Sequence, residues 1–289
     1  MTPFVSATDD PFGGSGGIVT AARQTCNVCL TFDFDAESIW LRKDRQSPSV
    51  LSRGTYGAKV GVPRILDLLA RYDIKATFFT PGWVAEQHPR EVEAIQRAGH
   101  EVAHHGYLHQ VKPYDMSPEE EWDNLERGVR ALQAVTGERP VGYRCPGGVI
   151  SPETHGFLIR AGFLYDSSMM DDERPYLVRV PGQSSALAEL PGCFELDDAP
   201  YFMFSFSPVY MTGNSDPDKV LRIWQSEFRG VYRESGFFMI MFHPQVIGRH
   251  HRMEILDKLI RYIRGFAGTT FRRCDELARE FLAHVVARA

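Results

Sequence analysis

The sequence of 289 residues contains no uninterrupted apolar run close to the roughly 18 residues that a membrane-spanning helix needs. Residues 1–17 have neither the basic start nor the apolar stretch of a secretory signal peptide. An excess of positive charge is also missing, because the formal net charge is −5 and the isoelectric point is about 6.1. These absences argue against a membrane protein and against a nucleic acid or an anionic membrane as the main partner. They lead us to expect a cytoplasmic location.

A cysteine pattern typical of disulfide bonds is lacking too. The five cysteines are odd in number and scattered, which is typical of reduced thiols and not of a disulfide framework. Cys26 and Cys29 form a C-x-x-C pair, but a second such pair is absent and Cys29 lies in an apolar strand pattern, so we interpret the pair as structural. With 43% hydrophobic residues and a mean hydropathy of −0.26, the chain has the composition of a globular protein with a sizeable core.

The chain divides into a short lead and one domain. A glycine-rich stretch at residues 11–17 has too little to bury, so residues 1–25 are predicted to form a flexible N-terminal arm. Residues 26–289 contain no further linker of this kind and are interpreted as a single domain.

Within this domain, strand and helix patterns alternate, which indicates an α/β fold with a parallel sheet covered by helices. Seven or eight such units in this length favour a distorted (β/α) barrel over an open sheet. The predicted strands are residues 28–33, 75–80, 101–103, 141–144, 163–165 and 237–242. The predicted helices include residues 60–72, 90–98, 117–135, 216–234, 252–264 and 275–286, with another starting near residue 151.

Polar side chains follow the carboxyl ends of five predicted strands, where barrels of this kind carry their catalytic residues. A purely structural role for all of them is hard to reconcile with this placement. The residues are Asp33 and Asp35, His105 and His109, Arg144, Asp166, and His243.

The segment H-H-G-Y-L-H, His104 to His109, carries three of the ten histidines. His105 and His109 can face one divalent metal if the chain between them makes a single helical turn, and Gly106 allows tight backbone there. Two histidines and one aspartate fit the three protein ligands of a catalytic zinc site. Zinc is the metal we expect, although a site of nitrogen and oxygen ligands also accepts cobalt, nickel or manganese.

The remaining residues suit hydrolysis by a metal-activated water molecule. The second carboxylate can accept the proton of that water, and His243 can protonate a leaving amine or, alternatively, cap the turn before Pro244. Arg144 can orient the base carboxylate or bind a substrate anion. Asp166 can orient Arg144 or a histidine.

With these residues assembled, the chain resembles the polysaccharide deacetylase (NodB-homology) superfamily over about residues 26–285. The motif T-F-D-D appears altered, as Thr31-Phe32-Asp33-Phe34-Asp35, whereas H-x-x-x-H at His105–His109 is intact. Arg144-Cys145-Pro146 matches R-x-P, and His243 matches the final histidine. The resemblance implies that Asp35, His105 and His109 bind the metal, that Asp33 is the base and that His243 is the acid. Phe34 between the two acids leaves the choice of metal ligand open, with Asp35 favoured.

Several segments resemble one branch of the superfamily, which contains cyclic imide hydrolases, peptidoglycan-deacetylase-like proteins and relatives of an allantoinase that has lost its metal. Because members of this branch form oligomers, the resemblance implies that this chain forms a homo-oligomer. The segments are residues 33–38, 52–57, 165–170, 189–191 and 196–201.

The resemblance implies a metal-dependent hydrolase of carbon–nitrogen bonds other than peptide bonds. Because no signal peptide is found, we expect a small cyclic imide or amide as the substrate. N-deacetylation of a carbohydrate or of peptidoglycan is the second hypothesis, and a non-catalytic binding protein on the same barrel is the third.

Four residues are predicted to contact the substrate. Arg53 and Tyr56 are placed in a long loop between a strand and a helix, where binding groups are common, and Pro146 and Asp166 follow later strands. The aromatic-rich stretch 200–206 is interpreted either as core or interface, or as an apolar lid over a ring substrate. Residues 248–252 are interpreted as a solvated turn before a helix.

Overall fold

The first strand, β1 (Cys26–Asp33), is apolar on both faces and lies inside a parallel sheet, as such strands usually do. The computed structural model describes residues 24–41, 47–109, 112–206, 209–211 and 214–286. One edge of β1 pairs along its length with β10 (Phe237–Phe242). The other edge is shared by β11 (Thr269–Phe271), which pairs at the start of β1, and β2 (Thr77–Thr80), which pairs at its end.

Eight strands of the described sheet run parallel: β11 beside β1, and the others in the order β10-β1-β2-β3-β4-β5-β7. Strand β6 pairs antiparallel with β7 at the far edge. These further strands are β3 (Glu101–His104), β4 (Gly142–Tyr143), β5 (Tyr165–Asp166), β6 (Tyr176–Arg179) and β7 (Ala186–Glu189). A separate two-stranded hairpin is formed by β8 (Phe204–Phe206) and β9 (Val209–Met211).

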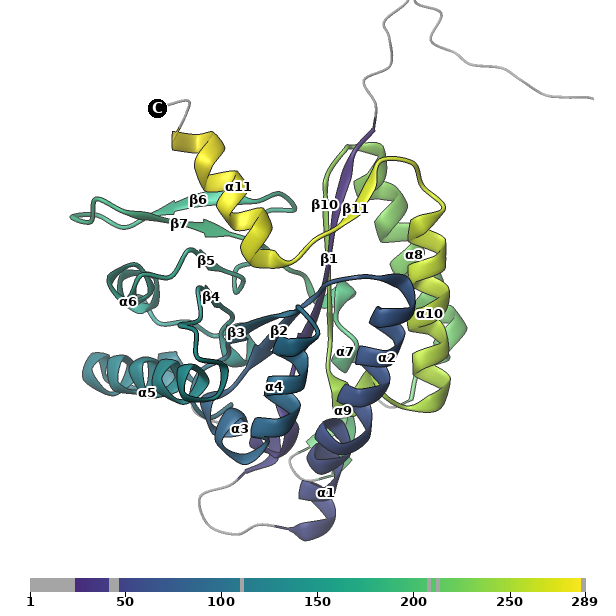
Figure 1. Cartoon of the computed structure of the whole chain (residues 1–289), viewed down its shortest axis with the longest axis horizontal. Helices are drawn as coiled ribbons and strands as arrows, with labels where there is room; N and C mark the ends of the chain where they lie inside the picture. The colour runs from purple at the N-terminus through teal and green to yellow at the C-terminus, as the bar shows by residue number, and fades with distance from the viewer. Residues whose placement is uncertain (1–23, 42–46, 110–111, 207–208, 212–213, 287–289) are drawn as a thin grey trace, which may run out of the picture.

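The single α/β domain with a distorted (β/α) barrel, predicted from the sequence, is confirmed. The sheet is strongly curled but open, since β10 and β6 lie at its two ends (Figure 1). Asp197 forms an isolated parallel bridge with Met241 on the outer side of β10. The chain that follows β7 therefore returns to the open side of the barrel.

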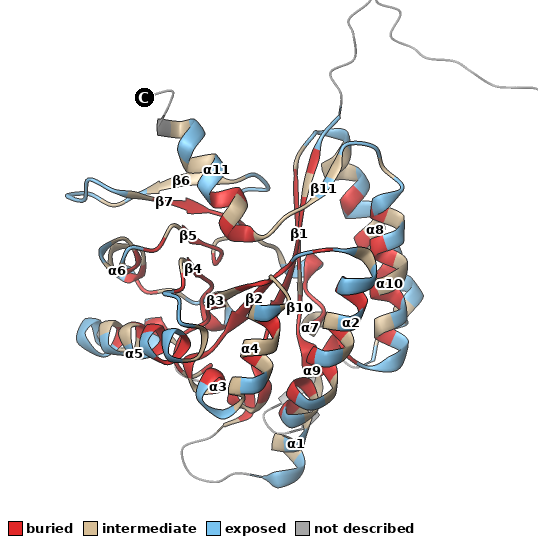
Figure 2. Cartoon of the chain, in the orientation of Figure 1, coloured by how far each residue is buried: buried red, intermediate tan, exposed pale blue. Residues whose placement is uncertain are grey.

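Helices cover the outside of the curled sheet, and their buried residues face it while their outer faces are exposed (Figure 2). They are α1 (Pro48–Tyr56), α2 (Val62–Tyr72), α3 (Gly82–Gln87), α4 (Pro89–Arg97), α5 (Pro118–Thr136), α6 (Thr154–Ala161), α7 (Ala199–Phe202), α8 (Pro217–Arg233), α9 (Pro244–Ile247), α10 (His250–Arg264) and α11 (Cys274–Val286). Short 3₁₀ turns are η1 (Ala36–Trp40), η3 (Pro113–Asp115), η4 (Pro146–Gly148) and η5 (Phe194–Leu196), and η2 (Gly57–Gly61) is a turn of π-helix. Among the described helices, none combines the length and the hydropathy that a bilayer crossing requires.

Two local predictions were wrong, those for residues 52–57 and 248–252. Residues 52–57 lie mainly in α1, because Gly54 and Gly57 do not break the helix but let it pack closely on neighbouring backbone. For the stretch 200–206, which forms α7 and the start of a hairpin, the core interpretation is confirmed at Phe202 and Met203, both buried in the main core. Residues 248–252 are not a solvated turn, since α10 starts at His250 and Arg252 is buried. The predicted N-terminal arm lies, up to residue 23, outside the described residues.

Candidate active site

Two carboxylates lie where β1 ends. Asp33 is the last residue of the strand and Asp35 follows after one residue, so the alternation of extended backbone directs both toward one side. Phe34 between them is fully buried in the main core, and its N–H donates to the carbonyl of Phe79 at 2.8 Å. The intervening phenylalanine thus fills the core and leaves both acids on the side of His105, whose Nε2 lies 3.7 Å from Asp33 Oδ2 and 3.5 Å from Asp35 Oδ1.

The backbone turns sharply after Asp35. Ala36 has a φ of 45°, in the left-handed region that residues other than glycine rarely adopt. Ser38 holds this turn, because its N–H and its hydroxyl donate to the carbonyl of Asp35 at 2.9 and 2.6 Å. Gly54 of α1 packs against it so closely that a Cβ at this position would lie 2.4 Å from the backbone of Ala36. Helix α1 therefore supports the turn that carries Asp35.

Replacement of Gly54 by alanine is expected to destabilise the protein by about 1–3 kcal/mol, because the added methyl group must displace backbone. It should also weaken metal binding, since the displaced turn begins at Asp35. Chemical unfolding and a metal titration test this. The control is Gly230→Ala in α8, where an added Cβ has no atom within 4 Å and should be neutral or stabilising. If the two variants have equal stability and equal metal affinity, α1 does not support the turn that carries Asp35.

The two predicted histidine ligands lie on the loop after β3, in a bend and not in the helical turn we had expected. Gly106 has a φ of 68°, which confirms that the tight backbone there requires glycine. The carbonyls of Gly106 and Tyr107 accept hydrogen bonds from the N–H groups of Gly82 and Trp83 at 3.0 and 2.8 Å. The bend is thereby fixed to the start of α3, and the rings of His105 and His109 lie 5.4 Å apart between centroids.

His104, the first histidine of the sextet, is packed beneath this loop. Its Nδ1 accepts a hydrogen bond from the N–H of Gly106 at 3.0 Å, so its Nε2 carries the proton and donates to the carbonyl of Leu125 at 3.1 Å. Burial lowers the pKa of His104 to about 3, and the ring is neutral. Gly128 of α5 makes room for it, because a Cβ there would lie 2.2 Å from Nε2. His104 thus positions the loop from outside the set of candidate ligands.

The side chains of Asp35, His105 and His109 form a buried cluster whose ligand atoms all lie within 4.8 Å of one another. Asp35 Oδ1 is 3.5 Å from His105 Nε2 and 4.0 Å from His109 Nε2. This buried oxygen has no hydrogen-bond partner among the described residues, which is costly for a carboxylate. A divalent cation between the three groups would satisfy it, and two nitrogens with one oxygen suit zinc, cobalt, nickel or manganese.

Neighbouring groups orient two of these candidate ligands. The Nδ1 of His105 donates to the carbonyl of Arg144 at 2.8 Å, which leaves the Nε2 lone pair facing Asp35. Gln245 of α9 donates through Nε2 to Asp35 Oδ2 at 3.2 Å. Burial raises the pKa of Asp35 to about 8, and His243 opposes this only in part. A cation in the cluster would favour the ionised form of this carboxyl group.

Asp33 is held by Arg144, which follows β4 and is almost completely buried. Arg144 Nη1 donates to Asp33 Oδ1 at 2.7 Å and to the hydroxyl of Thr31 at 3.0 Å, and Nη2 donates to the hydroxyl of Ser167 at 3.0 Å. Burial raises the pKa of Asp33, but Arg144, His105 and His243 together outweigh it, so the pKa lies below its ordinary value. Of the two roles considered for Arg144, these contacts correspond to orienting the base carboxylate.

His243, the first residue after β10, is held by a pair of acids. Its Nδ1 lies 2.7 Å from Asp198 Oδ1 and 3.5 Å from Asp197 Oδ1, while its Nε2 lies 3.8 Å from Asp35 Oδ2. Burial lowers the pKa of His243, but Asp197 and Asp198 outweigh it, so the pKa lies well above its ordinary value. The backbone carbonyl of His243 also caps α9, accepting from Val246 at 2.7 Å. His243 can therefore cap the turn before Pro244 with its backbone while its side chain lies in the site.

Asp198, Gln245 and Ser167 were not predicted as site residues. Asp197-Asp198 had been noted only as part of a branch resemblance, yet two adjacent acids in an otherwise apolar stretch are a usable signal. Gln245 lies two residues after His243, where the turn of α9 brings it back toward Asp35. Ser167 lies in another segment of the branch resemblance, residues 165–170, but its residue type gave no signal of a role, because serine is common after any strand.

The pocket at this site has a volume of about 130 Å³. Asp33, His109, Arg144 and His243 contribute to its lining. Apolar side chains supply most of the rest, among them the methionines Met169, Met170, Met203 and Met241. Two lining residues are conspicuously exposed for their type, Phe194 at 53% and Met170 at 42%, so apolar surface continues from the interior of the pocket to its mouth.

The four residues predicted to contact the substrate do not line this pocket. Arg53 borders a neighbouring cavity, and the Tyr56 hydroxyl is engaged with the carbonyl of Gly248 at 3.0 Å. Pro146 is buried beside Gly106. Asp166 contacts His155 of α6 at 3.0 Å, which is not one of the candidate site histidines, so its predicted role of orienting Arg144 or a histidine of the site stays a prediction.

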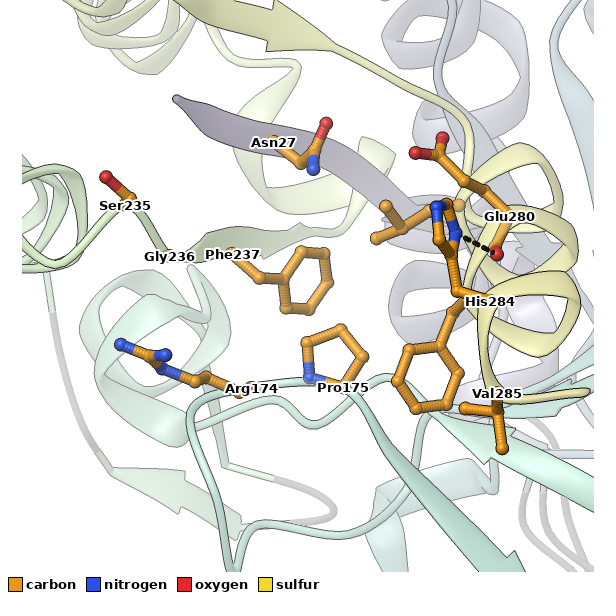
Figure 3. Close-up of a pocket in the computed structure, with 11 residues that line it drawn as sticks. Asn27, Arg174, Pro175, Ser235, Gly236, Phe237, Glu280, His284 and Val285 are labelled. Carbon is orange, nitrogen blue, oxygen red and sulfur yellow. Dashed lines mark hydrogen bonds between the residues drawn. The ribbon is translucent and has the colours of Figure 1, made fainter. Parts of the chain in front are cut away.

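Another hollow, of about 390 Å³, lies at the opposite end of the strands, between the starts of β1 and β10 and helix α11. Figure 3 shows Phe237 and Pro175 facing it from one side and His284 from the other. Its titratable lining residues are Arg174, Glu280 and His284, and the His284 ring is bound to the Glu280 carbonyl at 2.8 Å. This set lacks a carboxylate–histidine cluster, and the barrel rule places catalysis at the other end.

Two known proteins that are similar in sequence to this chain carry deacetylase names. The family model described as "Polysaccharide deacetylase" matches residues 27–165. A Helicobacter pylori protein named peptidoglycan deacetylase is 33% identical over 281 residues, covering 88% of this chain and 96% of that protein. A Gibberella zeae protein named peptidoglycan deacetylase-like protein FGM2 is 28% identical, covering 90% of this chain and 88% of that protein.

A solved structure from Mycobacterium smegmatis, assigned provisionally as a polysaccharide deacetylase, superposes with a TM-score of 0.85 and 33% identity. The match covers 94% of this chain and 95% of that one. The Puue allantoinase superposes with a TM-score of 0.81 and 24% identity, covering 91% and 92% of the two chains. At this level of identity, the likeness to the allantoinase shows a shared fold.

Proposed function

Because this chain belongs to the polysaccharide deacetylase family, we propose that it removes the acetyl group from an N-acetylated amino sugar of the peptidoglycan type. Members of this family are metal-dependent hydrolases of amide carbon–nitrogen bonds other than peptide bonds. The observation that carries the proposal is the cluster of Asp35, His105 and His109 with Asp33 and His243 beside it. Relatives named for peptidoglycan favour the sugar over the cyclic imide that we expected from the sequence.

In the proposed reaction, Asp35, His105 and His109 hold a divalent metal, which when bound polarises the acyl carbonyl and acidifies a water molecule. Asp33 accepts the proton of the attacking water through Oδ2, since Arg144 occupies Oδ1. The lowered pKa of Asp33 keeps this carboxylate ionised at neutral pH.

His243 completes the reaction by donating a proton to the amide nitrogen as the carbon–nitrogen bond breaks, which yields acetate and a free amine. Asp198 holds Nδ1, so the opposite nitrogen, Nε2, faces the site. The raised pKa of His243 keeps the imidazole protonated before the step. The apolar walls of the pocket exclude bulk water and so strengthen these electrostatic interactions.

The shape of the pocket agrees with this substrate. A deacetylase needs to enclose the acetyl group only, while the sugar ring stays at the entrance. The exposed Phe194 and Met170 offer such a ring an apolar surface at the mouth. The small interior of about 130 Å³ also suits a five-membered cyclic imide, which is therefore the second candidate.

A parallel assay distinguishes the two candidates. The metal-loaded protein is incubated with N-acetylglucosamine oligomers, with N-acetylmuramic-acid-containing fragments, and with succinimide and hydantoin. We expect release of acetate and a free amine from the glycans. Ring opening of the imides without any acetate release from the glycans would overturn the proposal.

Replacement of Phe194 by alanine is expected to raise KM for the glycan about tenfold with little change in kcat, because the ring contacts the sugar and not the reacting bond. Steady-state kinetics with N-acetylglucosamine oligomers measure this. Tyr114→Ala is the matched control, because Tyr114 is 66% exposed and does not line the pocket. An unchanged KM in the Phe194 variant would contradict the sugar-binding role of the mouth.

A further inference from the structure

A cavity of about 550 Å³ beside the active site is lined by three arginines, Arg53, Arg249 and Arg252. Arg53 belongs to α1, Arg249 precedes α10 and Arg252 lies in its first turn, so two stretches of backbone far apart in sequence bring the guanidinium groups to one cavity. Among the described residues that line it, none is an aspartate or a glutamate. We call this space the arginine cavity.

Each of these guanidinium groups is placed over an aromatic ring. Arg249 lies 3.6 Å from the ring centre of Tyr56, Arg252 lies 4.7 Å from that of Phe202, and Arg53 lies 5.2 Å from that of Trp40. Stacking of this kind orients a guanidinium and leaves its N–H groups at the edge available. Within the described part of the chain, none of the three arginines forms an ion pair with a carboxylate.

Arg252 is the most informative of the three because only 7% of it is exposed. Its Nη1 donates to the carbonyl of Val246 at 3.1 Å and its Nη2 donates to Asn214 Oδ1 at 2.8 Å. Its Nε is buried and has no partner among the described residues. A buried charge with neutral partners alone is costly, and an anion beside it removes that cost.

The arginines also repel one another. Burial lowers the pKa of Arg53 and Arg249 lowers it further. Burial lowers the pKa of Arg252 as well; Asp198 offsets part of this, and Arg249 and Arg53 add to the lowering. The protein therefore holds three positive charges around one cavity at a cost that a bound anion would relieve.

The cavity adjoins the catalytic groups. Gln245 lines it and donates a hydrogen bond to Asp35 Oδ2 at 3.2 Å. Met203 lines both the arginine cavity and the active-site pocket. A group bound in the cavity would thus lie one side chain away from the space in which the scissile bond is proposed to bind.

We propose that the arginine cavity binds an oxyanion, a carboxylate or a phosphate, and so selects substrates that carry one. The planar forks of arginine match either group with paired hydrogen bonds. The inference rests on the proposed function for the part that concerns the substrate. Two sources of the oxyanion fit this chemistry, a carboxylate of the substrate itself and a free small anion.

Calorimetric titration of the metal-loaded protein with inorganic phosphate tests the cavity without any turnover. We expect saturable binding that weakens at least about tenfold in the variant Arg53→Gln/Arg249→Gln. Arg160→Gln is the matched control, because Arg160 is exposed and stacks on Trp122 at 4.0 Å away from this cavity. Phosphate bound at the metal would persist in all three proteins, so the difference isolates the arginines. Identical phosphate binding by the double variant and the control would overturn the proposal, even if both fold and bind metal.

Kinetics identify the source of the oxyanion. If the substrate supplies it, the double variant raises KM about tenfold for fragments with the N-acetylmuramic acid carboxylate and leaves KM for neutral N-acetylglucosamine oligomers unchanged. If a free anion occupies the cavity, phosphate changes the kinetics of the neutral oligomers in the wild type and not in the double variant. If the wild type deacetylates neither glycan but the double variant still loses phosphate binding, the proposed function is refuted and the proposal of an anion site stands.

Discussion

Replacement of His105 by alanine is expected to abolish metal binding and to reduce kcat/KM by roughly a thousandfold or more. Two ligands, Asp35 and His109, would remain, too few for a catalytic zinc site. The fold should survive, although the carbonyl of Arg144 loses the hydrogen bond from His105 Nδ1, which costs about 1–3 kcal/mol.

Metal content of the purified variant, its circular dichroism spectrum and acetate release together measure this result. His284→Ala is the matched control, since His284 is an exposed histidine of α11 far from the cluster. A chelator should reduce the activity of the wild type to the level of the His105 variant. A variant that retains both bound metal and activity would refute the ligand assignment.

Replacement of His243 by glutamine is expected to lower kcat for amide substrates by about a hundredfold to ten-thousandfold. An amine cannot leave without a proton, and the His243 side chain is the proton donor in the proposed reaction. The loss should be much smaller for p-nitrophenyl acetate, because nitrophenolate leaves without protonation. Equal losses on the amide and on the ester would show that His243 does not act as the donor.

Asp198→Asn tests the same step through pH. A proton donor works in its protonated form, so activity falls as the pH rises through its pKa. Since the Asp198 carboxylate helps to raise the pKa of His243, its removal should move the alkaline limb of the kcat profile to lower pH. Asp197→Asn should move it less, because Asp197 lies 3.5 Å from Nδ1, compared with 2.7 Å for Asp198. Profiles that coincide with that of the wild type would contradict the assigned role of this pair.

The sequence was sufficient to predict the central residues that meet at the site, because parallel strands bring their carboxyl ends to one edge of a sheet. The pair Asp33 and Asp35, His105, and His243 lie far apart in sequence, yet each lies at or just after the end of a strand that the sequence pattern predicts. Their individual roles, the cytoplasmic location and the homo-oligomeric assembly stay predictions.

The groups that orient these residues could not be predicted, because they depend on distances that no local pattern encodes. Asp198 reaches His243 only because the chain after β7 returns beside β10. Helix α1 was missed because glycine has a low helix propensity, so Gly54 suggests that no helix continues through this position. In the folded chain the same glycine is required by the backbone of Ala36, a contact between segments that the sequence does not reveal.

The pairing of β1 also has a consequence for how the protein is made. Along one edge, the partner of β1 in the described part of the chain is β10, and the hydroxyl of Thr31 donates to the carbonyl of Ile240, 209 residues later. Contacts between such distant segments slow folding, and a nascent chain emerges from its N-terminus. The ribosome must therefore synthesise the protein through residue 242 before the strand that bears Asp33 has both of its neighbours. Asp33, the first of the proposed catalytic residues to be translated, is thus among the last to be fixed in place.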